Sequence, residues 1–155
     1  MFSLHLIIRG AGKHRVEGVE ITGVAAWHDA DHGAKRGPTT IFKLSIDGIN
    51  IRHLGDLGHL LTPEQAAAIG PVDIVCVPVG GFYTIDAPTA KTVVEQLRAR
   101  TILPMHYKYD ESIKLPIGPV SDFTGFYCGV VAQDHLVAER DSLPEESQVV
   151  GLGLA

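Results

Sequence analysis

Three polar residues in this 155-residue sequence belong to types that bind divalent metals, and each follows a run of residues typical of a β-strand. They are His28, Asp56 and His106. Imidazole nitrogen and carboxylate oxygen are ligands for zinc and related metals. Gly55 lets the backbone bend sharply before Asp56, which would present the carboxylate from a tight turn. We therefore interpret these three residues as candidate metal ligands, with a role for Asp56 in merely capping the turn as the alternative.

Four further residues lie close to these positions in the sequence and could contact a substrate or support the ligands: His53, Tyr83, Thr84 and Tyr107. Alternation along a strand would put His53 and Asp56 on different faces, so a supporting or structural role is expected for His53. Packing and turn formation are the simpler roles for the other three.

The segment after His28 is dense in polar residues, but its spacing matches neither a helical pattern nor a zinc finger. We expect Asp29, Asp31 and His32 to be solvated loop residues and His59 to lie on the surface before a helix. The run Lys35-Arg36-Gly37 could bind an anionic substrate, and a solvated turn is the simpler interpretation.

The hydrophobic pattern predicts an α/β (α+β) fold. Alternating residues predict strands, and Asp47-Gly48 predicts a hairpin turn. Thr62-Pro63-Glu64 is typical of a helix start and Gly70-Pro71 of its end. Asp86 is a plausible N-cap of a second helix, and Pro104 is expected to end a strand. The predicted strands are 19–26, 40–46, 49–54, 72–77, 101–103 and 148–154. The predicted helices are 63–69 and 87–98, and 121–127 could form a short helix.

Because ligand-binding groups lie beyond the carboxyl ends of strands in α/β layers, residues that follow strands are the natural site candidates. The unit from Val72 to Pro104 is expected to be a parallel βαβ unit, which would bring Asp56, Gly80-Gly81 and His106 to the same edge of the sheet.

Composition and length favour one globular domain over residues 1–155. A net charge of −5 and the lack of a basic cluster argue against nucleic acid or acidic membranes as partners. No apolar run reaches membrane-spanning length. Cys76 and Cys128 lie in apolar runs and are expected to be buried free thiols, which favours a cytoplasmic location.

The chain resembles the metallo-β-lactamase superfamily, most closely its branch of zinc-dependent hydrolases related to ascorbate-phosphate lactonase. The resemblance covers roughly residues 7–107 and a short part of the tail, with matching order, spacing and flanking residues. Its main segments are Trp27-His28-Asp29, His53-Leu54-Gly55-Asp56, Pro78-Val79-Gly80-Gly81, Tyr83-Thr84-Ile85-Asp86, Ile102-Leu103-Pro104-Met105-His106-Tyr107 and Leu143-Pro144-Glu145-Glu146.

The resemblance implies an αβ/βα sandwich with two metals, zinc or another divalent ion, at the sheet edges. It implies that His28 binds the first metal, that Asp56 bridges both and that His106 binds the second. Such a site would hydrolyse an ester, lactone or phosphoester of a small molecule.

The family signature His-x-His-x-Asp-His is absent from this sequence. We therefore expect an N-terminally incomplete domain, the C-terminal portion of the sandwich, that retains about two protein ligands per metal where catalytic zinc typically has three. Weak metal binding, impaired activity and a homo-oligomer or complementing chain would follow.

Two alternatives remain at this point. The chain could be a non-catalytic oligomerising or partner-binding domain that keeps only the scaffold. It could also hold one metal in a triad of two histidines and one carboxylate.

Overall fold

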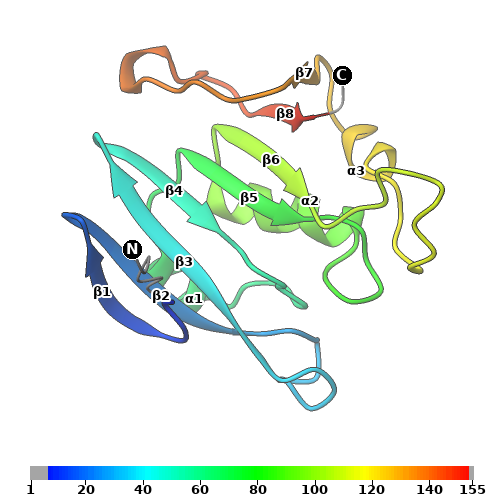
Figure 1. The fold of residues 1–155 in the computed structure, drawn as a ribbon, viewed down its shortest axis with the longest axis horizontal. Coiled ribbons are helices and arrows are strands. Elements are labelled where there is room, and N and C mark those ends of the chain that lie inside the picture. The colour runs from blue at the N-terminus through cyan, green and yellow to red at the C-terminus, as the bar shows by residue number, and fades with distance from the viewer. Residues whose placement is uncertain (1–6, 154–155) are drawn as a thin grey trace, which may run out of the picture.

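A computed structural model describes residues 7–153 of the chain. Within them the main feature is a mixed sheet in the order β1-β2-β3-β4-β5-β6-β8-β7 (Figure 1). The strands are β1 Gly12–Val16, β2 Val19–Trp27, β3 Pro38–Ile46, β4 Ile49–His53, β5 Ile74–Pro78, β6 Thr101–Met105, β7 Val131–Gln133 and β8 Gln148–Leu152. The helices are α1 Pro63–Ile69, α2 Ala87–Leu97 and α3 Ser121–Thr124, with a 3₁₀ turn at Arg140–Ser142.

The direction of the strands decides which loops can meet. Strands β1 to β4 pair antiparallel, while β4, β5 and β6 are parallel to one another. Since β2 and β4 are both antiparallel to β3, β2 runs in the same direction as β4, β5 and β6. The carboxyl ends of these four strands therefore lie at one edge of the sheet, as the sequence predicted for the later strands.

Local signals account for the turn and the helix starts. Asp47 and Gly48 both have positive φ, 49° and 78°, as expected for the predicted two-residue hairpin. Thr62 and Gln65 form a reciprocal capping box at the start of α1. Asp86 accepts a hydrogen bond from the backbone N–H of Thr89 at the start of α2.

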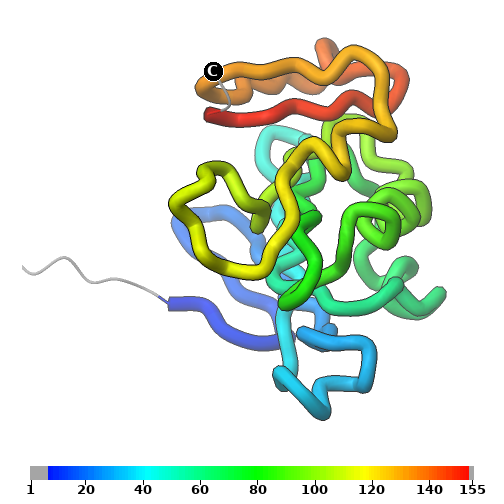
Figure 2. The backbone as a smooth tube through the Cα atoms, turned by 90° about the vertical axis from the view of Figure 1, so that its right-hand side faces the viewer, coloured from blue at the N-terminus to red at the C-terminus, as the bar shows by residue number. Residues whose placement is uncertain are grey.

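Helices α1 and α2 cover one face of the sheet, opposite the loop around residues 110–120 (Figure 2). The main core forms between this helical layer and the sheet and includes Val75, Val77 and Ile102 with Val93 and Val94 of α2. A smaller cluster of Ile49, Ile74 and Leu143 lies on a separate part of the sheet.

The carboxyl end of α1 has no basic residue of its own, and the sheet supplies two. Lys43 of β3 donates to the carbonyl of Ala68. Arg52 of β4, only 4% exposed, donates to the carbonyls of Ile69 at 3.0 Å, Leu44 at 2.9 Å and Ile51 at 2.9 Å. The carbonyls of Ala68 and Ile69 are among those that a helix end leaves unpaired, so these two contacts hold α1 against the sheet. The bonds from Arg52 to Leu44 and Ile51 fix its guanidinium on the strands.

The prediction that Pro104 ends its strand is wrong, because β6 continues to Met105 and Pro104 pairs with Val77. Val79 N–H bonds to Met105 O and Gln148 N–H bonds to Arg100 O, so alternate residues of β6 face β5 and β8. Pro104 lies an even number of residues after Arg100, so its backbone groups also point toward β8. The pairing between β6 and β8 extends only to Ile102, however. The missing N–H of Pro104 therefore removes no sheet hydrogen bond.

Other sequence expectations need smaller corrections. Cys76 and Cys128 are free, but Cys76 is only half-buried and Cys128, in the loop after α3, is exposed. Strands β1 and β7 were not predicted, and the predicted short helix at 121–127 ends at Thr124. Among the described residues, no helix is long and apolar enough to cross a membrane.

Replacing Arg52 with Met should lower the free energy of unfolding by about 2–4 kcal/mol, because the change leaves buried carbonyls without donors while preserving most of the volume. Urea unfolding at fixed protein concentration measures this effect. The matched control is Arg15→Met, because Arg15 forms only a 3.7 Å surface ion pair with Glu20, and a change of less than about 0.5 kcal/mol is expected. Equal effects for the two variants would contradict the role given to Arg52.

Candidate functional site

Backbone hydrogen bonds tie the loops at the carboxyl edge of the sheet to one another. Gly58 N–H donates to Trp27 O at 2.9 Å, which joins the loops that follow β4 and β2. Ile85 N–H donates to Leu57 O at 2.9 Å, and Gly80 N–H donates to His106 O at 3.1 Å. The loops that carry His28, Asp56 and His106 are thus parts of one connected edge.

Two glycines are required for this close approach. A Cβ atom on Gly58 would lie 2.3 Å from the backbone of His28 and Asp29. A Cβ atom on Gly80 would lie 2.2 Å from His106 O. Any other residue would force apart the loops that carry the candidate ligands.

The two histidine candidates each have a buried nitrogen with no hydrogen-bond partner in the described structure: His28 Nε2 and His106 Nδ1. Burying such a nitrogen without a partner is unfavourable, and a metal ion would satisfy it. His14 Nε2 and Tyr127 Oη are also unpartnered. His106 in addition has a φ of 55°, a strained conformation of the kind often found at functional sites.

Asp56 and His53 lie at the exposed end of β4. The backbone N–H of Gly55 donates to His53 Nδ1 at 3.1 Å, which places the proton of a neutral ring on Nε2. Loss of solvation lowers the pKa of His53, and the negative charge of Asp56 opposes this shift. Whenever the His53 ring is neutral, its Nε2 carries the proton and is available as a hydrogen-bond donor.

The remaining candidates have structural roles that can be seen directly. Thr84 is buried and its hydroxyl donates to Ile85 O at 3.4 Å. Tyr107 packs against the main core, and burial raises its pKa. Tyr83 is half-buried, with its ring centroid 6.5 Å from that of His106.

The three candidate ligands share an edge, but they do not form a ready metal cage. Within residues 7–153, no three His, Cys, Asp or Glu side chains form a group that could hold a metal ion. The donor types and the unpartnered nitrogens fit a metal, whereas the number of assembled ligands does not. The assignment of His28, Asp56 and His106 as ligands remains a prediction.

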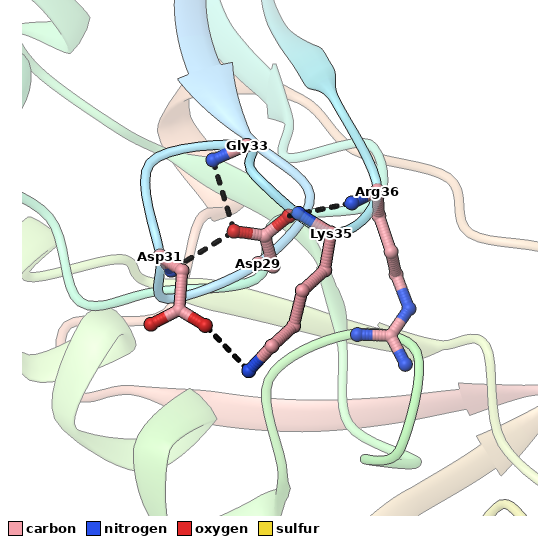
Figure 3. A network of polar contacts seen from close by, with 5 residues as sticks. All are labelled: Asp29, Asp31, Gly33, Lys35 and Arg36. Carbon is pink, nitrogen blue, oxygen red and sulfur yellow. Dashed lines mark hydrogen bonds and ion pairs between the residues drawn. The ribbon is translucent and has the colours of Figure 1, made fainter.

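The main error of the sequence analysis concerns Asp29. A solvated side chain was expected, but Asp29 is buried and only 5% exposed. Its carboxylate accepts backbone N–H groups from Asp31 and Gly33, both at 2.9 Å, and from Lys35 at 3.1 Å and Arg36 at 2.7 Å (Figure 3). Burial alone would raise the pKa of Asp29, but these donors outweigh it and hold the pKa below its ordinary value. Asp29 therefore fixes the loop that begins at His28.

His59 also has a role that its position in the sequence did not reveal. Its Nε2 accepts the backbone N–H of Trp27 at 3.1 Å, and its Nδ1 lies 2.6 Å from Leu60 O. The ring thereby holds the end of β2 against the loop after β4. The histidine after Gly58 gave no sign of this contact, because Trp27 lies 32 residues away.

A cavity of about 620 Å³ opens beside this edge, between the loops after β2, β4 and β5. Its lining includes the side chains of Trp27, His32, His59, Phe82 and Asp86. His28, Asp56 and His106 do not line it, so this cavity and the candidate ligands are neighbouring but separate features.

Comparison with known proteins identifies a matching family and several related hydrolases. The family described as the beta-lactamase superfamily domain matches residues 5–106. A metal-dependent hydrolase of Pyrococcus abyssi is 37% identical over 98 residues, which is 62% of this chain and 44% of the relative. One from Pyrococcus furiosus is 36% identical over the same shares. The chain thus spans less than half the length of these relatives.

Solved structures agree with the sequence comparison. A candidate Zn-dependent hydrolase of the metallo-β-lactamase superfamily from Thermotoga maritima superposes with a TM-score of 0.78 at 38% identity, covering 94% of this chain and 70% of that chain. A candidate metal-dependent hydrolase from Parabacteroides distasonis has a TM-score of 0.61 at 17% identity, covers 96% of this chain and 58% of that chain, and supports the fold alone.

Replacing Asp29 with Asn should lower the melting temperature by several degrees at neutral pH, because an amide oxygen cannot replace both carboxylate oxygens as acceptors. The folded-state pKa is lowered, so the contribution of Asp29 is present above the ordinary carboxyl pKa of about 4 and is lost as pH falls through the folded value. Thermal unfolding of both proteins across this range should show the difference narrowing in acid. A difference that is constant with pH would contradict the assignment.

Replacing Gly58 with Ala should destabilise the fold by about 1–3 kcal/mol and shift the NMR signals of the His28 ring, because the new methyl group meets backbone atoms that cannot move freely. Gly118→Ala is the control, since its nearest contact is the flexible end of the Asp122 side chain at 3.0 Å. An unchanged His28 signal in the Gly58 variant would refute the proposed contact between the loops.

Proposed function

Since this chain belongs to the beta-lactamase superfamily domain family, whose relatives are named metal-dependent hydrolases, we propose that it forms part of a metal-dependent hydrolase. The proposed metal ligands are His28, Asp56 and His106. The observation that carries the proposal is the pair of buried, unpartnered nitrogens, His28 Nε2 and His106 Nδ1, on the edge that also bears Asp56.

A bound divalent metal, zinc or a related ion, would act as a Lewis acid on an ester, lactone or phosphoester. The chain's own residues have separate tasks. His28 and His106 would each offer a ring nitrogen to the metal, and Asp56 would add a carboxylate from the same edge of the sheet. His53 holds a proton on Nε2 and can donate it in a hydrogen bond to a substrate oxygen.

We further propose that the complete site takes donors from a second polypeptide or a second copy of this chain. Catalytic zinc typically has three protein ligands, and residues 7–153 assemble no such group. A partner that supplies ligands would also cover the sheet face opposite the helices, where Leu44, Ile51 and Leu103 are only half-buried. By this proposal, the chain alone binds metal weakly and hydrolyses slowly.

A non-catalytic scaffold is the second candidate, which the lack of an assembled three-ligand group among residues 7–153 favours. Elemental analysis of purified protein, with mass determined by light scattering, separates the possibilities. About two metals per chain in an assembly would support a complemented site, one would support a single-metal triad, and none would support the scaffold.

Replacing His28, Asp56 or His106 with Ala should each weaken zinc binding by about tenfold or more, because each change removes a proposed direct ligand. Calorimetric titration with zinc measures the loss. His135→Ala is the matched control, because His135 is an exposed histidine on a different part of the fold.

The ligand assignment predicts three weakened variants and an unaffected control. It would be refuted if zinc affinity stayed unchanged in all three variants, or if His135→Ala weakened binding equally.

A further inference from the structure

Arg36 stands out in the loop after β2 because a hydrogen bond fixes its backbone, while its guanidinium N–H groups make no hydrogen bond within the described residues. The Arg36 backbone N–H is held by the Asp29 carboxylate at 2.7 Å. The side chain extends away from that carboxylate and is exposed (Figure 3). The hydrogen bond to Asp29 therefore positions the Arg36 backbone and leaves the guanidinium N–H groups free of that contact.

The guanidinium lies against two aromatic rings from the loop after β5. Its central carbon is 5.9 Å from the ring centroid of Phe82 and 5.6 Å from that of Tyr83, both within cation–π range. The two rings meet edge-on, with centroids 4.8 Å apart. Phe82 is 61% exposed and has a φ of 57°, so this aromatic side chain is held outward in a strained backbone.

The cluster of Arg36, Phe82 and Tyr83 extends to His106, one of the proposed metal ligands. The Tyr83 ring stands edge-on to His106, with centroids 6.5 Å apart. Arg36, Tyr83 and His106 therefore form a row in space, with each residue on a different loop. Only the Tyr83 ring separates the guanidinium from His106, a proposed metal ligand.

The neighbouring charges leave Arg36 without an acidic partner. Lys35 forms an ion pair with Asp31, and Asp29 is already satisfied by four backbone donors. In the part of the chain that the structure describes, the Arg36 side chain makes no ion pair or hydrogen bond. The two aromatic rings orient the planar guanidinium, while its N–H groups have no acceptor among the described residues. This geometry matches the two oxygens of an oxyanion.

We propose that Arg36 is a specificity residue that binds an oxyanion group, carboxylate or phosphate, on the substrate. The proposal rests on the proposed hydrolase function and adds that the preferred substrates are anionic. Phe82 and Tyr83 hold the guanidinium in place, and the oxyanion would lie beside the ester, lactone or phosphoester that reacts near His106.

Binding of small aromatic probes tests this proposal without turnover. Benzoate, phenyl phosphate and neutral benzamide are titrated into the full chain, with a chelator present, and followed by NMR of the arginine Nε–H groups. Because no metal or hydrolysis is needed, a failure here is distinct from a failure of the hydrolase proposal. The two anions distinguish a carboxylate from a phosphate preference.

The wild type should bind at least one anion more tightly than benzamide. Arg36→Gln should weaken that binding by about tenfold or more, which corresponds to losing a charge-assisted hydrogen bond. Arg36→Lys should restore only part of it, because the ammonium keeps the charge but loses the planar fork.

Lys35→Gln is the matched control, since it removes the same charge one position away and should leave binding nearly unchanged. Neither substitution at position 36 removes the backbone N–H that Asp29 holds, so both variants should fold. The proposal is overturned if neither anion binds better than benzamide, or if the variants at positions 35 and 36 lose binding equally.

Discussion

Direct backbone contact between loops far apart in the sequence is the constraint on which this edge of the molecule depends. Trp27 O meets Gly58 N–H, and His106 O meets Gly80 N–H. Both contacts require glycine, because a Cβ atom at either position would lie within 2.3 Å of backbone atoms. Parallel alignment of β2, β4, β5 and β6 brings the loops to one edge, and these contacts fix their spacing.

The carboxylate of Asp29 adds a second level of order. A loop of this length has many backbone N–H groups that sheet pairing cannot satisfy, and one buried carboxylate gathers four of them. The result is a rigid loop with His28 at its start and Arg36 near its end. One interaction therefore positions both a proposed metal ligand and a proposed substrate-binding residue.

Much of the fold could be predicted from the sequence because its signals are local. Thr62-Pro63, Asp86 and Asp47-Gly48 act within a few residues, and each forms the cap or turn expected of it. Strand β1 was missed because its polar residues, among them Lys13, His14 and Arg15, lack the hydrophobic alternation of a half-buried strand. The prediction that Pro104 ends its strand failed because the point at which β8 stops pairing with β6 depends on the assembled sheet.

The shared edge of the three candidate ligands was predictable from the sequence, but the contacts that support their loops were not. Residues that follow parallel strands must share an edge, which is why His28, Asp56 and His106 lie on connected loops. The burial of Asp29 depends on the path of a whole loop, and the hydrogen bond of His59 joins residues 32 positions apart. No short motif encodes either contact.

Metal binding by His28, Asp56 and His106 is tested most directly by a crystal structure of the zinc-loaded protein, with anomalous scattering recorded at the zinc edge. If these residues bind zinc, a peak should lie about 2.0–2.2 Å from His28 Nε2 or His106 Nδ1 and from the Asp56 carboxylate. Zinc bound only at other residues, with both of those nitrogens free, would contradict this assignment.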